Sequence, residues 1–118
     1  MKRSIEDILH ELIQISYDPL FQKMDILDIT TSILKARLLI DADICIQIYE
    51  NVRKPKASYT MIIGNNRFYG RDMREGFWHR HPIDDPKIHD DSEEASRSIT
   101  ISEFVQEVKE ILIQKELI

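Results

Sequence analysis

Twelve consecutive residues, "RDMREGFWHRHP" from Arg71 to Pro82, carry the side chains of this chain that are best suited to chemistry. They include three arginines, two histidines and a tryptophan. An imidazole titrates near neutral pH, so His79 and His81 could move protons or hold a metal ion. If residues 77–81 are extended, both histidines point to one face of a strand, while Trp78 and Arg80 point to the other.

The first chemistry that this pattern predicts is metal-independent cleavage of RNA, which needs no cofactor. One imidazole would take the proton of a 2′-hydroxyl, the other would donate a proton to the leaving oxygen, and an arginine would stabilise the charge on the phosphate. The candidate catalytic residues are His79, His81 and Arg71, with Asp72 as an orienting group. The candidate RNA-binding residues, which hold phosphates or stack on bases, are Arg67, Arg74, Arg80, Trp78 and Tyr69.

The second chemistry is metal binding by a set of histidines. The ligands would be His79, His81 and His89, joined by one of Asp84, Asp85 or Asp90. Histidine and carboxylate ligands suit zinc, manganese or iron. The H-x-H spacing is also common in ordinary strands, in which arginines face water and aromatic side chains fill the core.

Charge is distributed unevenly along the chain, whose net charge is −5. Residues 51–81 hold seven Lys or Arg against two Asp or Glu, whereas residues 82–118 hold four against ten. The overall acidity argues against nonspecific binding of nucleic acid, but a local basic stripe can still hold phosphates. The acidic segment could also cover this stripe within the same molecule.

Two amphipathic helices are predicted at the ends of the chain. Apolar residues at helical spacing predict the first helix over about residues 4–16, and Ser4 with Asp7 forms a capping box at its start. The C-terminal segment shows the same spacing after Thr100, which forms a second capping box with Glu103.

Between the helices, apolar and alternating runs predict two antiparallel hairpins. Their turns are the polar "DAD" at residues 41–43 and the "GNN" at residues 64–66, where glycine and asparagine tolerate positive φ. A short run at residues 77–81 and a polar loop follow. We therefore expect an α+β fold: an N-terminal helix, an antiparallel meander of about four strands, and a C-terminal helix packed on one face of the sheet.

The length and composition suit a soluble globular protein with a single domain over residues 1–118, in which residues 1–20 form an N-terminal helical extension. The single cysteine, Cys45, excludes an intramolecular disulfide, and we expect it to be a buried structural thiol. The chain has neither a signal-peptide apolar region nor a run of about 18 apolar residues. The expectation is a cytoplasmic protein with no membrane partner.

The order of elements and two motifs resemble a known family. A hairpin "SYTMIIGNNRFYGRDM" is followed by the arginine–aspartate pair and histidine segment of "RDMREGFWHRHP", and then by the threonine-led helix "TISEFVQEVKEIL". This arrangement is similar to the TumE-like family of toxins from type II toxin–antitoxin pairs. It covers about residues 30–113, with Arg71 and Asp72 at the family's pair and His79 and His81 in its histidine segment. The family's histidine segment is usually denser, whereas Arg80 separates the two histidines here.

The resemblance implies a toxin-type protein whose partner is an antitoxin of the helix-turn-helix kind. It does not by itself give a reaction, so RNA cleavage is an inference from the residues. The residues leave open whether the protein is an enzyme. The alternatives are a non-catalytic interaction module, which forms a homodimer or binds a partner, and a histidine-rich metal-binding protein.

Overall fold

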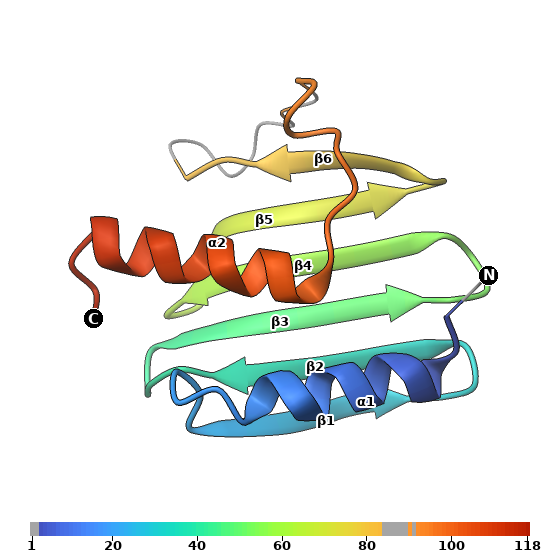
Figure 1. The fold of residues 1–118 in the computed structure, drawn as a ribbon, viewed down its shortest axis with the longest axis horizontal. Helices are drawn as coiled ribbons and strands as arrows, with labels where there is room; N and C mark the ends of the chain where they lie inside the picture. The colour runs from blue at the N-terminus through green and yellow to red at the C-terminus, as the bar shows by residue number, and fades with distance from the viewer. Residues whose placement is uncertain (1–2, 84–89, 91) are drawn as a thin grey trace.

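The computed structural model describes residues 3–83, 90 and 92–118. The elements run in the order α1 (Ile5–Ser16), β1 (Lys23–Ile29), β2 (Ile33–Leu39), β3 (Ile44–Asn51), β4 (Lys56–Ile63), β5 (Asn66–Arg74), β6 (Phe77–His81) and α2 (Ile101–Gln114). The strands form one six-stranded antiparallel meander in the order β1 to β6, and both helices lie on the same face of it (Figure 1). The predicted α+β fold is confirmed, whereas the predicted count of about four strands is wrong.

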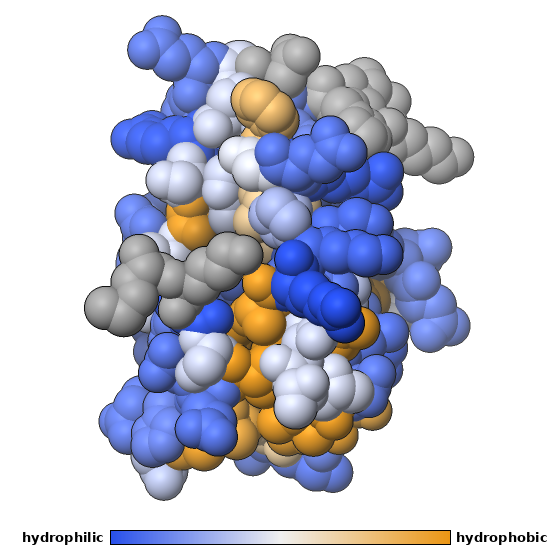
Figure 2. Space-filling model, turned by 90° about the vertical axis from the view of Figure 1, so that its right-hand side faces the viewer, coloured by the Kyte–Doolittle hydropathy of each residue, from blue (hydrophilic) through white to orange (hydrophobic). Residues whose placement is uncertain are grey.

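The two edge strands account for the difference in strand count. β1 is mostly exposed and carries several charges, so it lacks the apolar alternation of a half-buried strand. A bulge at Leu27 also interrupts its pairing with β2. β6 is only five residues long. Seen from one end, hydrophobic residues gather mainly in the lower half of the molecule, where β1 and β2 lie, and hydrophilic ones are more frequent above them (Figure 2).

Both helices begin at the predicted capping boxes. The Ser4 hydroxyl accepts from the backbone N–H of Asp7 at 3.1 Å, and the Asp7 carboxylate accepts from the backbone N–H of Ser4 at 3.0 Å. Thr100 and Glu103 make the same reciprocal pair at 3.0 and 2.8 Å. These bonds satisfy N–H groups that have no partner within the helix, so each helix has a fixed start.

Alternation along the strands places the core between the sheet and the helices. Ile44, Ile46 and Ile48 of β3 are buried on the face that the helices cover, in one cluster with Leu12 of α1 and Phe104 of α2. Helix α1, which the sequence predicted as an N-terminal extension, therefore contributes to the core.

We call the other side of the sheet the helix-free face, because both described helices lie on the opposite side (Figure 1). It carries Gln47 and Tyr49 of β3 and, on β4, Ser58 and Thr60. Cys45 lies on this face and is half-buried, so the expectation of a fully buried thiol is wrong. In the described ranges, no helix is long and apolar enough to span a bilayer.

Candidate active site on the helix-free face

The β5–β6 hairpin brings three side chains of the "RDMREGFWHRHP" stretch together on the helix-free face. Asp72 lies directly opposite His79 in the strand register, and His81 is two residues further along β6. All three therefore point the same way, as the predicted alternation of residues 77–81 requires. The turn is tight because Glu75 and Gly76 both have positive φ, 53° and 84°.

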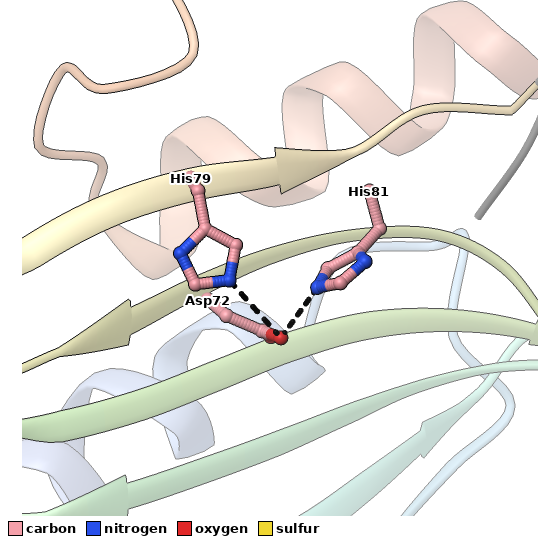
Figure 3. A group of neighbouring side chains, drawn as sticks. All are labelled: Asp72, His79 and His81. Carbon is pink, nitrogen blue, oxygen red and sulfur yellow. Dashed lines mark hydrogen bonds and ion pairs between the residues drawn. The ribbon is translucent and has the colours of Figure 1, made fainter. Parts of the chain in front are cut away.

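Both imidazoles converge on one oxygen of Asp72 (Figure 3). His81 Nε2 lies 2.8 Å from Asp72 Oδ2, which is hydrogen-bond distance, and His79 Nε2 lies 3.9 Å from the same oxygen. The ring centroids are 5.3 Å apart and the rings meet edge to face. We call Asp72, His79 and His81 the His–Asp cluster.

Side chains of β4 and β5 hold the carboxylate of the cluster in place. The Ser58 hydroxyl on β4 donates to Asp72 Oδ1 at 2.8 Å, and Arg67 Nη1 lies 3.6 Å from Asp72 Oδ2. The side chains of Asp72 and His79 are 14% exposed, and that of His81 is 5% exposed. The carboxylate is thus fixed on both oxygens, and of the two imidazoles His79 is the more accessible.

A pocket of about 240 Å³ opens beside the cluster, over β3, β4 and β5. Its wall includes three cationic side chains and only one carboxylate, that of Asp72. The polar residues that line it are Tyr49, Lys56, Ser58, Arg67, Asp72 and Arg74. The basic stripe predicted from the charge distribution therefore has a concave part next to the histidines.

Arg71 lies on the opposite face of the sheet, because adjacent residues of a strand point in opposite directions. Only 4% of Arg71 is exposed. Its guanidinium donates to both carboxylate oxygens of Glu107 on α2, at 3.1 and 2.6 Å, and to the backbone carbonyl of Ala95 at 3.2 Å. Burial is the largest single influence and opposes the charge of Arg71, but the hydrogen bonds and charge interactions with Glu107 and Tyr69 together raise the pKa of the guanidinium above its ordinary value.

The two aromatic candidates also face the helix side. Tyr69 donates to the same Glu107 carboxylate at 2.7 Å, and burial together with this bond raises its pKa to about 12. Trp78 packs on Tyr59 with ring centroids 5.5 Å apart.

Arg80 is tied to the segment that follows β6. It makes an ion pair with Asp90 at 2.6 Å, and the backbones of the two residues pair as an isolated bridge. Hydrogen bonds from the Ser92 backbone and from Arg80 hold the pKa of Asp90 at about 2. The acidic segment therefore covers part of the basic stretch.

The predicted site thus divides between the two faces of the sheet. The structure brings together His79, His81, Asp72, Arg67 and Arg74, but it does not bring Arg71, Arg80, Trp78 or Tyr69 to them. His89, the third predicted metal ligand, lies outside the described residues, as do Asp84 and Asp85.

Sequence reasoning missed two residues of the site, Ser58 and Tyr49, whereas Lys56 belongs to the predicted basic stripe. A signal for Ser58 existed in the β4–β5 hairpin, because the residue opposite Asp72 must share its face. A bulge in β5 shifts the register by one position, so pairing counted from the turn alone would have placed Ala57, and not Ser58, opposite Asp72.

The cluster also has the composition of a metal site. One nitrogen from each histidine and one oxygen of Asp72 all lie within 4.8 Å of one another. Two imidazoles and a carboxylate suit zinc, manganese or iron, and a metal bound there would keep open positions for water or substrate.

Comparison of the chain with protein-family models, with curated proteins and with solved structures finds no match. The functional argument therefore rests on the geometry of the cluster and of the pocket beside it.

Proposed function

We propose that this protein is a toxin-type protein of a toxin–antitoxin pair and that it cleaves RNA at the His–Asp cluster without a metal ion. One observation carries the proposal. Two imidazole nitrogens converge on a single carboxylate oxygen at the edge of a basic pocket. These groups suit acid–base cleavage of a phosphodiester: two imidazoles for proton transfer, a carboxylate that orients one of them, and nearby cations that can hold the RNA backbone.

In this reaction His79 acts as the general base, because its side chain is the more exposed of the two imidazoles. It takes the proton of the 2′-hydroxyl, and the 2′-oxygen then bonds to phosphorus. The bond from phosphorus to the 5′-oxygen breaks, and His81 donates a proton to that oxygen. Asp72 holds the His81 ring by its 2.8 Å contact. The products are a 2′,3′-cyclic phosphate end and a 5′-hydroxyl end.

The biological context of the proposal comes from the resemblance over residues 30–113 to the TumE-like family. The partner would be a helix-turn-helix antitoxin, which would hold the toxin inactive in the cell. Induced expression of the chain without that partner should arrest bacterial growth, and co-expression of an antitoxin encoded beside it should restore growth. Growth arrest that persists in the His79→Ala variant, at equal protein levels, would count against the His–Asp cluster as the toxic centre.

The direct test is cleavage of single-stranded RNA in the presence of EDTA. Wild type and the control variant His10→Ala should cleave equally, because His10 is exposed on α1, far from the cluster in the fold. His79→Ala and His81→Ala should each lower kcat by about 10²- to 10⁴-fold, which is the usual contribution of an acid–base group. Product ends should be 2′,3′-cyclic phosphate and 5′-hydroxyl. Unchanged cleavage in both variants would refute the assignment.

A second candidate function is a metal-dependent centre, and the mutual distances within 4.8 Å favour it. The metal would be held by Asp72, His79 and His81. It would supply a Lewis acid and an activated water there. Elemental analysis of the purified protein, with His79→Ala as the comparison, tests for binding. A stoichiometric metal in wild type that His79→Ala lacks, together with loss of activity in EDTA, would favour the metal-dependent centre over metal-independent cleavage.

A further inference from the structure

The pocket beside the His–Asp cluster has the chemistry of an anion site. Lys56 and Arg74 face each other across the β4–β5 pair, and Arg67 stands on the same face. The charged lining holds three cations against the single carboxylate of Asp72. That carboxylate is already engaged by the Ser58 hydroxyl at 2.8 Å and by Arg67 at 3.6 Å. An incoming anion therefore meets an excess of positive charge, and two of its partners are arginines, which match phosphate oxygens well.

The pocket also lies at a defined distance from the histidines. Asp72 belongs both to the pocket wall and to the cluster, and His79 stands opposite it on the neighbouring strand. Neighbouring strands are about 4.8 Å apart, so a group bound over β4 and β5 lies roughly 5–10 Å from the imidazoles. That is the range of separation between neighbouring phosphates of one nucleic-acid strand.

We propose that this pocket is a phosphate subsite, which holds the backbone phosphate next to the one that is cleaved. The identity of the ligand as RNA rests on the proposed function, whereas the binding of phosphate to the pocket does not. Tyr49 lines the far wall and offers a ring on which an unpaired base can stack. The preferred substrate is then single-stranded RNA with at least two phosphates, one of which is cleaved while the other fills the subsite.

Binding of inorganic phosphate tests the pocket without any need for cleavage. Side-chain NMR signals of the arginines should shift with phosphate in a saturable manner in wild type and in His79→Ala. Arg74→Gln should weaken the binding about tenfold, as expected for loss of one arginine–phosphate contact. The matched control is Arg37→Gln, because Arg37 is an exposed arginine of β2 on the same face, where it donates to Gln47 at 3.0 Å. Arg74 is also exposed, so both variants should keep the wild-type melting temperature.

Substrate length provides the second measurement. Arg74→Gln should raise KM for a trinucleotide about tenfold, and the increase should be much smaller for a dinucleotide, which has a single phosphate and leaves the subsite empty. Saturable phosphate binding without any RNA cleavage would leave the subsite in place and remove the proposed function. Equal phosphate binding in wild type, Arg74→Gln and Arg37→Gln, or no saturable binding at all, would overturn the subsite even if the RNA is cleaved.

Discussion

At the scale of single residues, Asp72 has the central place in the site. Its two oxygens contact Ser58 of β4, Arg67 of β5 and His81 of β6. The Nε2 of His79 lies 3.9 Å from one of them. The 2.8 Å contact fixes the orientation of the His81 ring, and the same oxygen faces His79. Exchange of Asp72 for a neutral side chain of the same shape should therefore act on chemistry more than on folding.

Asp72→Asn is the variant that tests this. The amide keeps the size of the carboxylate, but it removes the charge and can no longer accept on both oxygens. We expect the kcat of RNA cleavage to fall by about 10²-fold or more, with a melting temperature close to that of wild type. Circular dichroism and cleavage kinetics measure the two effects. Wild-type kcat in a folded Asp72→Asn would show that the histidines do not need the carboxylate.

Glu50 gives a residue-scale prediction about pH. Its side chain is only 14% exposed, Arg3 Nη1 stands 3.9 Å away, and burial raises its pKa above the ordinary 4.5. A raised pKa means that the folded state prefers the protonated form, so ionisation of Glu50 lowers stability as the pH rises above the value of the unfolded chain.

Glu50→Gln removes this unfavourable ionisation. The melting temperature should rise by a few degrees at pH 7, and the gain should disappear as the pH falls below about 4. Thermal unfolding of wild type and variant between pH 3 and pH 8 measures it. A gain that is independent of pH would mean that packing, and not the charge, is responsible.

At the scale of elements, the β5–β6 hairpin explains how much of the site could be predicted. Simple alternation along residues 77–81 correctly places His79 and His81 on one face and Trp78 and Arg80 on the other. The same rule separates Arg71 from Asp72, because neighbours in a strand cannot share a face. These residues are close in sequence and were therefore predicted to form one site, but the sheet separates them onto its two faces.

The partner strand β4 could not be placed in the same way. The turn at Gly64 pairs Ile63 with Asn66, and regular pairing from there would set Ser58 opposite Arg71. A bulge at Phe68 shifts the register by one residue, so Ser58 lies opposite Asp72 instead. Nothing in the local pattern marks Phe68 as the extra residue, and a shift of one residue changes which side chains share a face. The helices and their capping boxes, which depend on local spacing, were predictable.

Glu107 links α2 to the sheet by polar contacts, because its carboxylate accepts from both Arg71 and Tyr69. Loss of Glu107 leaves the Arg71 guanidinium buried without its carboxylate, and removal of one partner of a buried ion pair is strongly destabilising. We predict that Glu107→Gln lowers the free energy of unfolding by about 3 kcal/mol. Glu110→Gln, at an exposed position of the same helix, should change it little.

Urea denaturation measures both Glu107→Gln and Glu110→Gln. Equal midpoints for the two variants would show that Arg71 finds another partner. In that case the proposed structural role of Arg71 would be wrong, and its predicted role in the reaction would need a separate test.

At the scale of the whole molecule, the basic helix-free face belongs to a chain whose net charge is −5. Binding of RNA should therefore come from a few local cations and not from a general field. Each phosphate neutralised on a single strand adds about 0.7 to the dependence of log affinity on log salt concentration. With one phosphate held by Lys56, Arg67 and Arg74, we expect the pocket to contribute about −0.7 to the slope, and this contribution should become smaller in Arg74→Gln.

Fluorescence anisotropy with a labelled RNA in the uncleaving His79→Ala background measures this slope between low and physiological salt. If Arg74→Gln leaves the slope unchanged, or if Arg37→Gln makes it equally shallower, the pocket is not where the RNA phosphates bind.

The uninterrupted order of the meander has a consequence for how the molecule is made. Every strand pairs with the strand that precedes it in the chain, and no crossover joins distant segments of the sheet. Asp72 and His81 are only nine residues apart in the chain, whereas Arg71 and its partner Glu107 are 36 residues apart. Low sequence separation favours early and fast contact formation. On a chain emerging from a ribosome, the face with the histidines would therefore assemble first, and the last helix would close the opposite face afterwards.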